Sequence, residues 1–446
     1  MIRFIGLALA GAAIALPVHA ADLWDVYQAA LNNDPVIREA LANRNAQREA
    51  RPQARALLLP DVGLSGSKSD STTDGTQIGL GAGGEVELVD FSSESESTRY
   101  SLGLNQTIFR WDRWVNLRQA GDRVARAEID FEAARQQLIV RVAERYFDVL
   151  AAQDNLAFAE ANQEAISRQL DQATRRFEVG LIAITDVQEA QAGFDLAVAD
   201  EINARRQLAS AREFLREVTG THFTELAGPG TELPLIRPEP ANEDAWVQRA
   251  LQDNLALNAQ RLTAEIADKE VSRQRAGHLP TLDLTANRSR NESTGATPFD
   301  TSDTESSSVS LQFNMPIFSG GGTRSLVRQA AYQHEAAKAV LEREARATER
   351  TARDAFLGVQ SEISRVSALR QALQSNETAL KATEAGFEVG TRTTVDVLNA
   401  RSTAFRARND LARSRYDYLL NTLRLQQAIG ALSEADVQQI NGMLED

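Results

Sequence analysis

The chain of 446 residues contains no cysteine, which excludes structural disulfides and metal sites built on cysteine. It also lacks an excess of basic residues, because 48 Lys and Arg stand against 62 Asp and Glu and leave a net charge of −14. Nucleic acids are bound by basic surfaces. This charge balance therefore argues against a nucleic-acid partner.

Aromatic residues and prolines are scarce. Aromatics make up 6% of the chain, and the 11 prolines leave two tracts, 61–228 and 317–446, without any. Since proline interrupts helices, each tract can carry a very long helix, and the abundance of Ala, Arg, Gln, Glu and Leu favours one. Between the tracts, "GPGTELPLIRPEP" from Gly228 to Pro240 has the composition of a linker.

Long apolar runs are also missing. The run from Phe4 to Leu16 is too short to span a bilayer, and with Arg3 before it and Val18-His19-Ala20 after it, residues 1–20 read as a signal peptide. A short N-terminal anchor is the alternative. No later segment approaches 18 apolar residues, so no transmembrane helix is expected. An exported chain of this kind is either soluble in the periplasm or inserted as a β-barrel.

Catalytic and metal-binding motifs are not apparent. Residues 79–84, "GLGAGG", have the spacing of a dinucleotide site but open no helix after a buried strand, so we interpret them as a flexible loop. The histidines at positions 19, 222, 278 and 334 have no metal-ligand spacing, and neither a G-x-S-x-G motif nor a P-loop occurs. The sequence predicts no enzyme, no cofactor and no metal site.

The two halves of the chain repeat one another. "FEVGLIAITDVQEA" from Phe177 matches "FEVGTRTTVDVLNA" from Phe387, "LLPDVGLSGS" from Leu58 matches "HLPTLDLTAN" from His278, and both halves close on a glycine, at 220 and 430. Self-similarity in the same order indicates a tandem repeat. We therefore predict a signal peptide 1–20, a first repeat 21–227, a linker 228–241, a second repeat 242–432 and a C-terminal tail 433–446.

Each repeat has the same predicted elements. A first helix covers about 22–57 or 242–277, and a strand pair follows, at about 58–70 and 99–109 or at about 279–290 and 308–318. The joining loops, about 69–98 and 291–307, are polar. In "SVSLQFNMPIF", apolar side chains alternate with polar ones, as in a two-sided strand long enough to cross a bilayer when tilted.

A very long helix and a returning helix complete each repeat. The first long helix, from about Asp112 to Arg176, would measure roughly 100 Å at about 1.5 Å per residue, which no globular core accommodates. Two apolar flanks on it, one along Leu138, Val142 and Val149, indicate neighbouring helices on both sides. An ordinary two-stranded coiled coil is the alternative for these helices.

Four strands per chain cannot close a membrane barrel, because closed barrels begin at about eight strands and open edges are not tolerated in lipid. Three copies would supply twelve strands. The predicted fold is an α+β membrane protein: a trimeric 12-stranded outer-membrane β-barrel continued by a long periplasmic α-helical barrel. The competing hypothesis is a soluble periplasmic coiled-coil scaffold or adaptor, and an envelope enzyme would lack any catalytic constellation.

Four stretches resemble the TolC family of outer-membrane efflux proteins: "LWDVYQAALNNDP" from Leu23, "GHLPTLDLTA" from Gly277, "RRFEVGLIAITDVQEA" from Arg175 and "AGFEVGTRTTVDVL" from Ala385. The resemblance covers essentially the whole mature chain. It implies a homotrimer in the outer membrane of a Gram-negative bacterium that expels drugs, toxic small molecules or secreted proteins. The implied partners are outer-membrane lipid, a periplasmic adaptor (membrane fusion) protein and an inner-membrane transporter of RND, ABC or MFS type.

The repeated turn is the reversal between the long helix and the returning one. Gly180 and Gly390 suit a helix C-terminal position that needs a positive φ. Residues 185–188, "TDVQ", fit a capping box for the next helix, and Thr393 or Thr394 with Asp396 fits a weaker one.

The resemblance also implies roles for residues of these turns. Asp396 matches the aspartate ring that constricts the family's periplasmic mouth, whereas Asn399 stands where the family has a second aspartate. Links that hold the mouth shut are implied for Thr185, Asp186 and Arg392, with Phe387 where a tyrosine is frequent. Adaptor docking is implied at the hairpin tips, at Gly180, Leu181, Gly390 and Thr391.

Overall fold

The computed structural model describes residues 20–80, 83–230, 233–295 and 301–445. The predicted signal peptide therefore lies almost wholly outside the described residues. The described residues divide into two compact units, one formed by those within 20–41, 131–257 and 345–445 and the other by those within 42–130 and 258–344. The helices that run on from one unit into the other are continuous in secondary structure.

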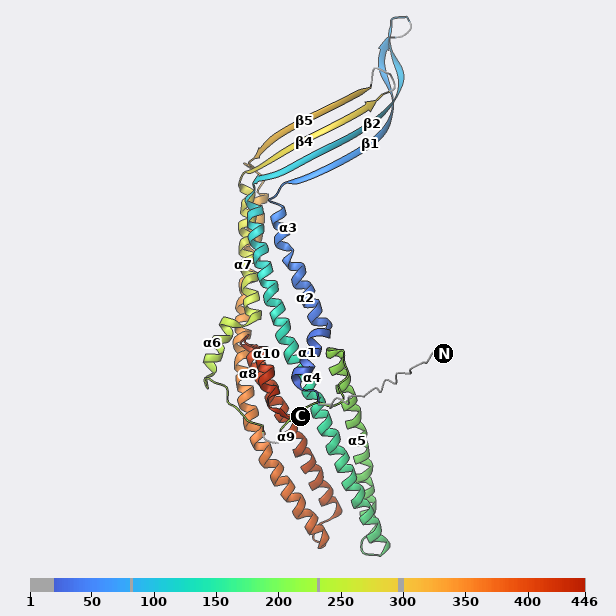
Figure 1. Ribbon diagram of the computed structural model, residues 1–446, viewed down its shortest axis with the longest axis vertical. Helices are drawn as coiled ribbons and strands as arrows, with labels where there is room; N and C mark the ends of the chain where they lie inside the picture. Colours follow the sequence, from blue (N-terminus) through green and yellow to red (C-terminus); the bar gives the residue numbers. More distant parts are fainter. Residues whose placement is uncertain (1–19, 81–82, 231–232, 296–300, 446) are drawn as a thin grey trace, which may run out of the picture. The chain divides into compact units, whose positions relative to one another are not determined.

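The elements follow one another in the same order in both halves (Figure 1). The first half contains α1 Leu23–Asn33, α2 Pro35–Arg48, α3 Ala50–Ala56, β1 Asp61–Leu80, β2 Val86–Phe109, α4 Trp111–Glu178, α5 Ile184–Thr219 and β3 Gly228–Pro229. The second contains α6 Glu243–Asp253, α7 Leu255–Arg275, a 3-10 turn Ala276–His278, β4 Thr281–Thr294, β5 Ser302–Asn314, α8 Gly322–Glu388, α9 Thr394–Ala428, α10 Glu434–Asn441 and β6 Leu444–Glu445.

The first helix of each half is broken, although the sequence predicts one continuous helix. Asp34 between α1 and α2 is extended, with ψ 122°, because the residue before a proline avoids the helical region. Asn254 has ψ 126° between α6 and α7. The corner formed at each break packs against the end of its own repeat. A Cβ added at Gly220 would lie 3.1 Å from Asn33, and one at Gly430 would lie 2.3 Å from the carbonyl oxygen of Asp253.

The core of the first unit is helical and apolar. Buried side chains from α1, α4 and α9 meet in it, among them Leu23, Tyr27, Leu138, Val142, Tyr146, Leu419 and Leu423. The Tyr146 hydroxyl donates to the carbonyls of Ala21, at 3.2 Å, and Ala227, at 2.5 Å, which ties α4 to the ends of the first repeat.

The predicted tail and linker contain regular structure. Residues 434–441 form α10, and Leu444–Glu445 pairs with Gly228–Pro229 as an antiparallel ladder. No apolar pattern marks such short elements; contacts with distant parts of the chain stabilise them.

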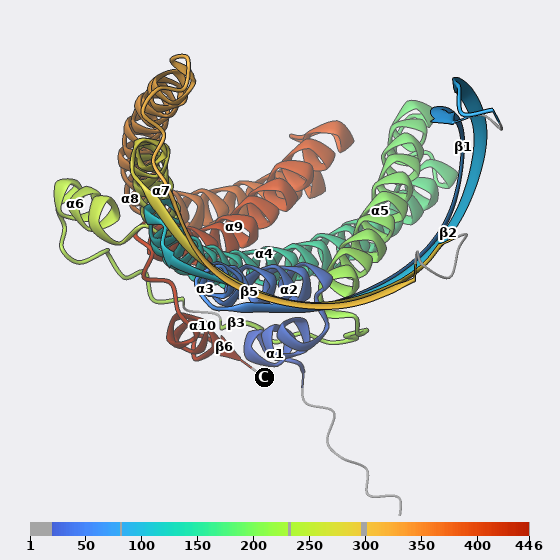
Figure 2. The ribbon, with the colours of Figure 1, turned by 90° about the horizontal axis from the view of Figure 1, so that it is seen from above.

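The second unit contains an antiparallel sheet in the order β1-β2-β4-β5, and seen from above this sheet bends into an arc (Figure 2). The predicted first strand pair is too short. The segment 69–98, expected to be a polar loop, is mostly strand, since Asp61↔Asn105 to Leu80↔Val86 pair without interruption. Serine and threonine interrupt the apolar alternation, but their backbone groups pair as well as any others, and threonine favours strands.

The second strand pair also differs from its prediction. β5 begins at Ser302, within the expected loop, and ends at Asn314 instead of continuing to 318. Pro316 has no N–H to donate to a ladder, which accounts for the early end. The part of the loop at 296–300 lies outside the described residues. Among the helices that are described, none is long and apolar enough to cross a membrane.

Candidate functional site at the helical hairpin tips

The site residues predicted from the sequence lie at two turns of the first unit, one between α4 and α5 and one between α8 and α9. In the first turn Gly180 has φ 74°, a left-handed conformation that costs a residue with a Cβ about 1–2 kcal/mol. The Gly180 N–H donates to the carbonyl of Phe177 at 2.8 Å, and the Leu181 N–H donates to that of Arg176 at 2.9 Å. These two bonds end α4 in a Schellman motif.

The second turn repeats this geometry. Gly390 has φ 81°, its N–H donates to the carbonyl of Phe387 at 3.1 Å, and the Thr391 N–H donates to that of Gly386 at 2.8 Å. The shared "FEVG" therefore writes the same helix stop twice.

The start of the first returning helix differs from the prediction, whereas the second has the predicted capping residues. α5 begins at Ile184, so its N-cap is Ala183 and not Thr185; Asp186 accepts the Ala183 N–H at 3.2 Å, but alanine offers no oxygen in return. At α9 the capping box is complete, because Asp396 accepts the Thr393 N–H at 2.9 Å and the Thr393 hydroxyl accepts the Asp396 N–H at 3.2 Å. The second box, expected to be weaker, is the stronger one.

The carboxylate of Asp396 is held in its charged form. The hydrogen bond from the Thr393 backbone lowers the pKa of Asp396 below its usual value, and the Thr393 hydroxyl and the charge of Arg392 act in the same direction. Asn399, one turn further along α9, is exposed. One charged and one neutral side chain therefore occupy the two predicted constriction positions.

The two predicted partners Arg392 and Asp186 do not meet within one chain. In the parts of the chain that the structure describes, no ion pair joins them. Instead, the guanidinium of Arg176 on α4 lies 5.3 Å from the centre of the Phe387 ring on α8. This cation–π contact joins the two hairpins through Phe387, the position at which the resemblance suggested a tyrosine. The sequence stretch "RRFEVG" contains Arg176, but spacing alone does not indicate its partner.

The tips carry exposed aliphatic side chains. Val179, Leu181 and Val389 are 70%, 72% and 76% exposed, and a Cβ added at Gly180 or Gly390 would meet nothing within 4 Å. The tips of a single chain thus leave open apolar surface beside the two glycines.

Behind the tips, α4 and α5 pack against α9. A Cβ added at Gly193 of α5 would lie 3.1 Å from Leu398, so glycine permits the close approach of these two helices. Further along, α4 and α9 are joined by Phe158–Phe405, whose ring centres lie 6.4 Å apart, and by polar contacts of 2.9, 2.6 and 2.9 Å in the pairs Asn155–Asn409, Asp154–Tyr416 and Asp148–Arg413.

Asp154 is one of several titratable groups at this interface. Burial raises the pKa of Asp154, more than the hydrogen bond from Tyr416 and the charge of Arg415 lower it. Burial also raises the pKa of Tyr416, which remains a donor.

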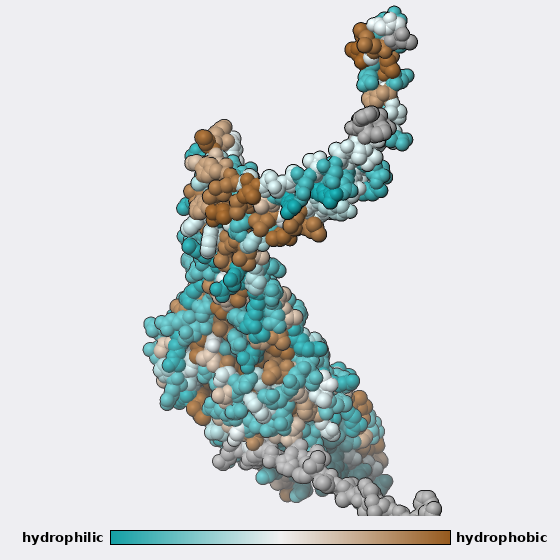
Figure 3. Space-filling view, turned by 45° about the horizontal axis from the view of Figure 1, so that its top comes forward, coloured by the Kyte–Doolittle hydropathy of each residue, from teal (hydrophilic) through white to brown (hydrophobic). Residues whose placement is uncertain are grey.

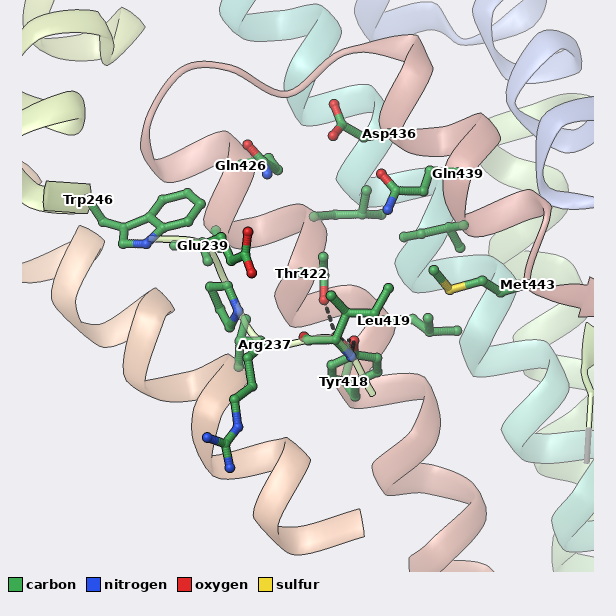
Figure 4. A pocket seen from close by; sticks show the side chains of 16 residues that line it. Arg237, Glu239, Trp246, Tyr418, Leu419, Thr422, Gln426, Asp436, Gln439 and Met443 are labelled. Carbon is green, nitrogen blue, oxygen red and sulfur yellow. Dashed lines mark hydrogen bonds between the residues drawn. The ribbon is translucent and has the colours of Figure 1, made fainter. Parts of the chain in front are cut away.

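A separate cavity of about 230 Å³ lies in the first unit, among α6, α9, α10 and the segment 236–239 (Figure 4). Its polar groups are largely engaged: the Trp246 indole donates to the carbonyl of Pro240 at 2.9 Å, the Tyr418 hydroxyl accepts the Ile236 N–H at 2.8 Å, and Asp436 accepts the Ser433 N–H at 2.8 Å. Within the described ranges, no group of three or more His, Cys, Asp and Glu side chains could hold a metal ion.

Comparison with known proteins gives concordant matches. The sequence model of the family described as "Outer membrane efflux protein" matches residues 26–221 and 246–431, one match for each half. The chain is 37% identical to the outer membrane protein TolC of Escherichia coli over 99% of its own length and 88% of that protein. It is 31% identical to the alkaline protease secretion protein AprF of Pseudomonas aeruginosa, over 94% of the chain and 86% of that protein.

The fold is shared with solved channels. The Campylobacter jejuni CmeC outer membrane channel superposes with a TM-score of 0.77 at 17% identity, covering 95% of this chain and 90% of that one. Two helical hairpins and a four-stranded antiparallel sheet in one chain are thus an architecture with known members.

Proposed function

The chain belongs to the outer membrane efflux protein family, and from that premise we propose that three copies of it close into a single duct. The protein resides in the outer membrane, extends into the periplasm, and serves as the exit for drug efflux or for type I protein secretion. Its family consists of channel and transport proteins; we propose that this chain performs no catalysis.

The observation that carries the proposal is the open sheet. One face of its base is apolar and exposed: Val62, Leu64, Val309, Leu311 and Phe313 are 62%, 80%, 76%, 63% and 64% exposed, and the register puts them on the same side. The outer edges of β1 and β5 have no strand partner among the described residues. In lipid an unpaired edge costs several kcal/mol per backbone group. Three copies pairing the base of β1 with β5 remove the edges of the four-stranded part of the sheet and give twelve strands.

The hairpin tips form the mouth in this proposal. Three Asp396 carboxylates around an axis, each favoured in its charged form, make one acidic ring that attracts cations. Asn399 contributes no second ring. Since Arg392 and Asp186 do not pair within a chain, we place their link, with Thr185 beside it, between hairpins of neighbouring copies.

The apolar tips suit docking of a periplasmic adaptor, which would connect the duct to an inner-membrane transporter. Leu181 and Thr391 follow the two glycines, and the open space beside Gly180 and Gly390 lets a partner approach the backbone. The relatives named for protease secretion and for efflux fit either class of cargo.

The decisive experiment is to reconstitute the protein in planar bilayers and to test for heat-sensitive trimers in the outer-membrane fraction. A conducting trimer is expected. A monomer in the soluble periplasmic fraction without conductance would support the scaffold hypothesis instead.

The docking proposal has its own test. Gly390→Trp should abolish drug resistance while trimers still assemble, because the indole fills the open space beside the tip. Gly390→Ala is the matched control, since it introduces the same φ strain without the bulk. Resistance that survives Gly390→Trp, or that Gly390→Ala removes equally, would exclude this surface.

A further inference from the structure

The hairpin formed by β1 and β2 extends beyond the rest of the sheet (Figure 1). Residues 71–80 of β1 pair with 86–95 of β2, whereas β4 begins to pair with β2 only at Glu96. In the described part of the chain this segment is a two-stranded ribbon, about 30 Å long at about 3.3 Å per residue. An isolated ribbon is only marginally stable in water, so we expect a binding partner to stabilise a ribbon of this length.

The end of the ribbon has one apolar face. Ile78 pairs with Leu88 and Leu80 pairs with Val86, so the four side chains point to the same side. They are 75%, 73%, 76% and 72% exposed, and Figure 3 shows hydrophobic surface at the far end of the hairpin. Exposed aliphatic side chains that gather on one face mark an interaction site.

The same face is acidic below this patch. Directly paired residues and every second residue along each strand share a side, and the register puts these carboxylates on the apolar side: Asp70, Asp74, Asp90, Glu94 and Glu96. Lys68 forms an ion pair with Glu96 at the end of this row that is nearest the rest of the sheet. Between residues 69 and 98 the sequence contains no Lys, Arg or His. The face therefore combines four aliphatic side chains with a row of negative charge.

The opposite face is covered by its own side chains. A Cβ added at Gly75 would lie 3.0 Å from the Phe91 ring, and one at Gly79 would lie 3.0 Å from Val89. Glu87 is paired with Gly79 and lies on this side. The two faces thus differ in both charge and apolar exposure.

We propose that the acidic and apolar face of this ribbon binds an extended basic polypeptide with aliphatic residues at one end. Taken over both strands, an acidic group recurs at every second register position along the ribbon, at intervals of about 7 Å, which matches Lys or Arg at every second position of an extended partner. The open edges of the ribbon can pair with such a segment as an added strand. Face-to-face packing of a second copy would bring like charges together, and an anionic lipid surface would be repelled. The proposed duct would place this ribbon outside the cell, and that position is the one point of the proposal that rests on the duct.

The test uses the full chain in lipid nanodiscs and a fluorescein-labelled peptide in which a short leucine run precedes alternating lysine and serine. Fluorescence anisotropy should show binding that weakens as salt is added. Leu88→Ser should weaken binding about tenfold with the charge unchanged, and Glu94→Gln should weaken it about tenfold and reduce the salt dependence. Glu87→Gln, which makes the same charge change on the other face, should leave the affinity within about twofold.

Three results would overturn the proposal. One is equal binding of a peptide with glutamate in place of lysine. Another is an equal effect of Glu87→Gln and Glu94→Gln, which would mean that the peptide is attracted by the net charge of the protein and not by this face. The third uses the absence of native cysteine: if Leu80→Cys forms disulfide-linked dimers of the protein upon mild oxidation, a second copy covers the face. Each of these results leaves conductance, and hence the proposed duct, untouched.

Discussion

Gly430→Ala isolates the contribution of a single backbone contact to stability. Gly430 and Gly180 have the same φ, 74°, so a Cβ is equally strained at both positions. Their surroundings differ: at Gly430 the new Cβ would lie 2.3 Å from the carbonyl oxygen of Asp253, and at Gly180 it would meet nothing within 4 Å.

The difference between the two variants follows from these geometries. The left-handed conformation costs alanine about 1–2 kcal/mol at either site. At Gly430 the backbone must also move away from Asp253, and overpacking of this kind costs about 1–3 kcal/mol more. Displacement would stretch the bond that Gln136 Nε2 donates to the Gly430 carbonyl at 2.9 Å. We expect Gly430→Ala to destabilise by about 2–5 kcal/mol and Gly180→Ala by about 1–2 kcal/mol.

Urea denaturation of the detergent-solubilised protein, followed by the loss of helical circular dichroism, measures this difference. The denaturation midpoint of Gly430→Ala should fall well below that of Gly180→Ala, with similar slopes. Equal midpoints would refute the reasoning, because they would mean that the corner at Asp253 moves aside at no cost and that the fit of Gly430 against it is not a constraint.

Three further predictions concern the hairpins. Arg392→Ala should raise single-channel conductance if the residue locks the mouth, and an unchanged conductance would count against the lock. Arg176→Gln should remove about 0.5–1 kcal/mol of cation–π attraction to Phe387 and make the tips more accessible to protease; a protection pattern equal to the parent's would contradict this. Because the pKa of Asp154 is raised, its contribution to stability is present below about pH 3.9 and is lost as pH rises through the folded-state pKa. Asp154→Asn, which can still accept from Tyr416, should therefore gain stability relative to the parent as pH rises from about 4 to about 7, whereas a pH-independent difference would contradict the assignment.

The predicted fold class is confirmed by its likeness to solved channels, and the reason lies in repeated local signals. The glycine stops and the alternation in "SVSLQFNMPIF" are each recognisable within a few residues, and the proline-free tracts are recognisable from composition alone. Element ends were harder to predict. Strand pairing over 69–98 depends on backbone hydrogen bonds that serine and threonine make without an apolar signature, and the α1–α2 break depends on one extended residue before Pro35.

Part of the candidate site can be predicted from the sequence. "FEVG" predicted the two helix stops, and Asp396 was found in a first helical turn. The sequence does not show which of the two helix caps is the better formed. α5 begins at Ile184, so its N-cap is an alanine and not Thr185. The contacts Arg176–Phe387 and Asp154–Tyr416 join residues more than 200 positions apart, and no spacing rule connects them.

By itself, the sequence determined the elements and their repetition, because helix stops, strand alternation and proline exclusion act through neighbouring residues. Only the tertiary structure decided which partners those elements meet. It placed Gly430 against Asp253, joined α4 to α9 through a half-buried carboxylate, and extended one hairpin into a ribbon with an apolar, acidic face. Such pairings depend on side chains and backbone groups that are distant in sequence, and their energies exist only once the chain has brought them together.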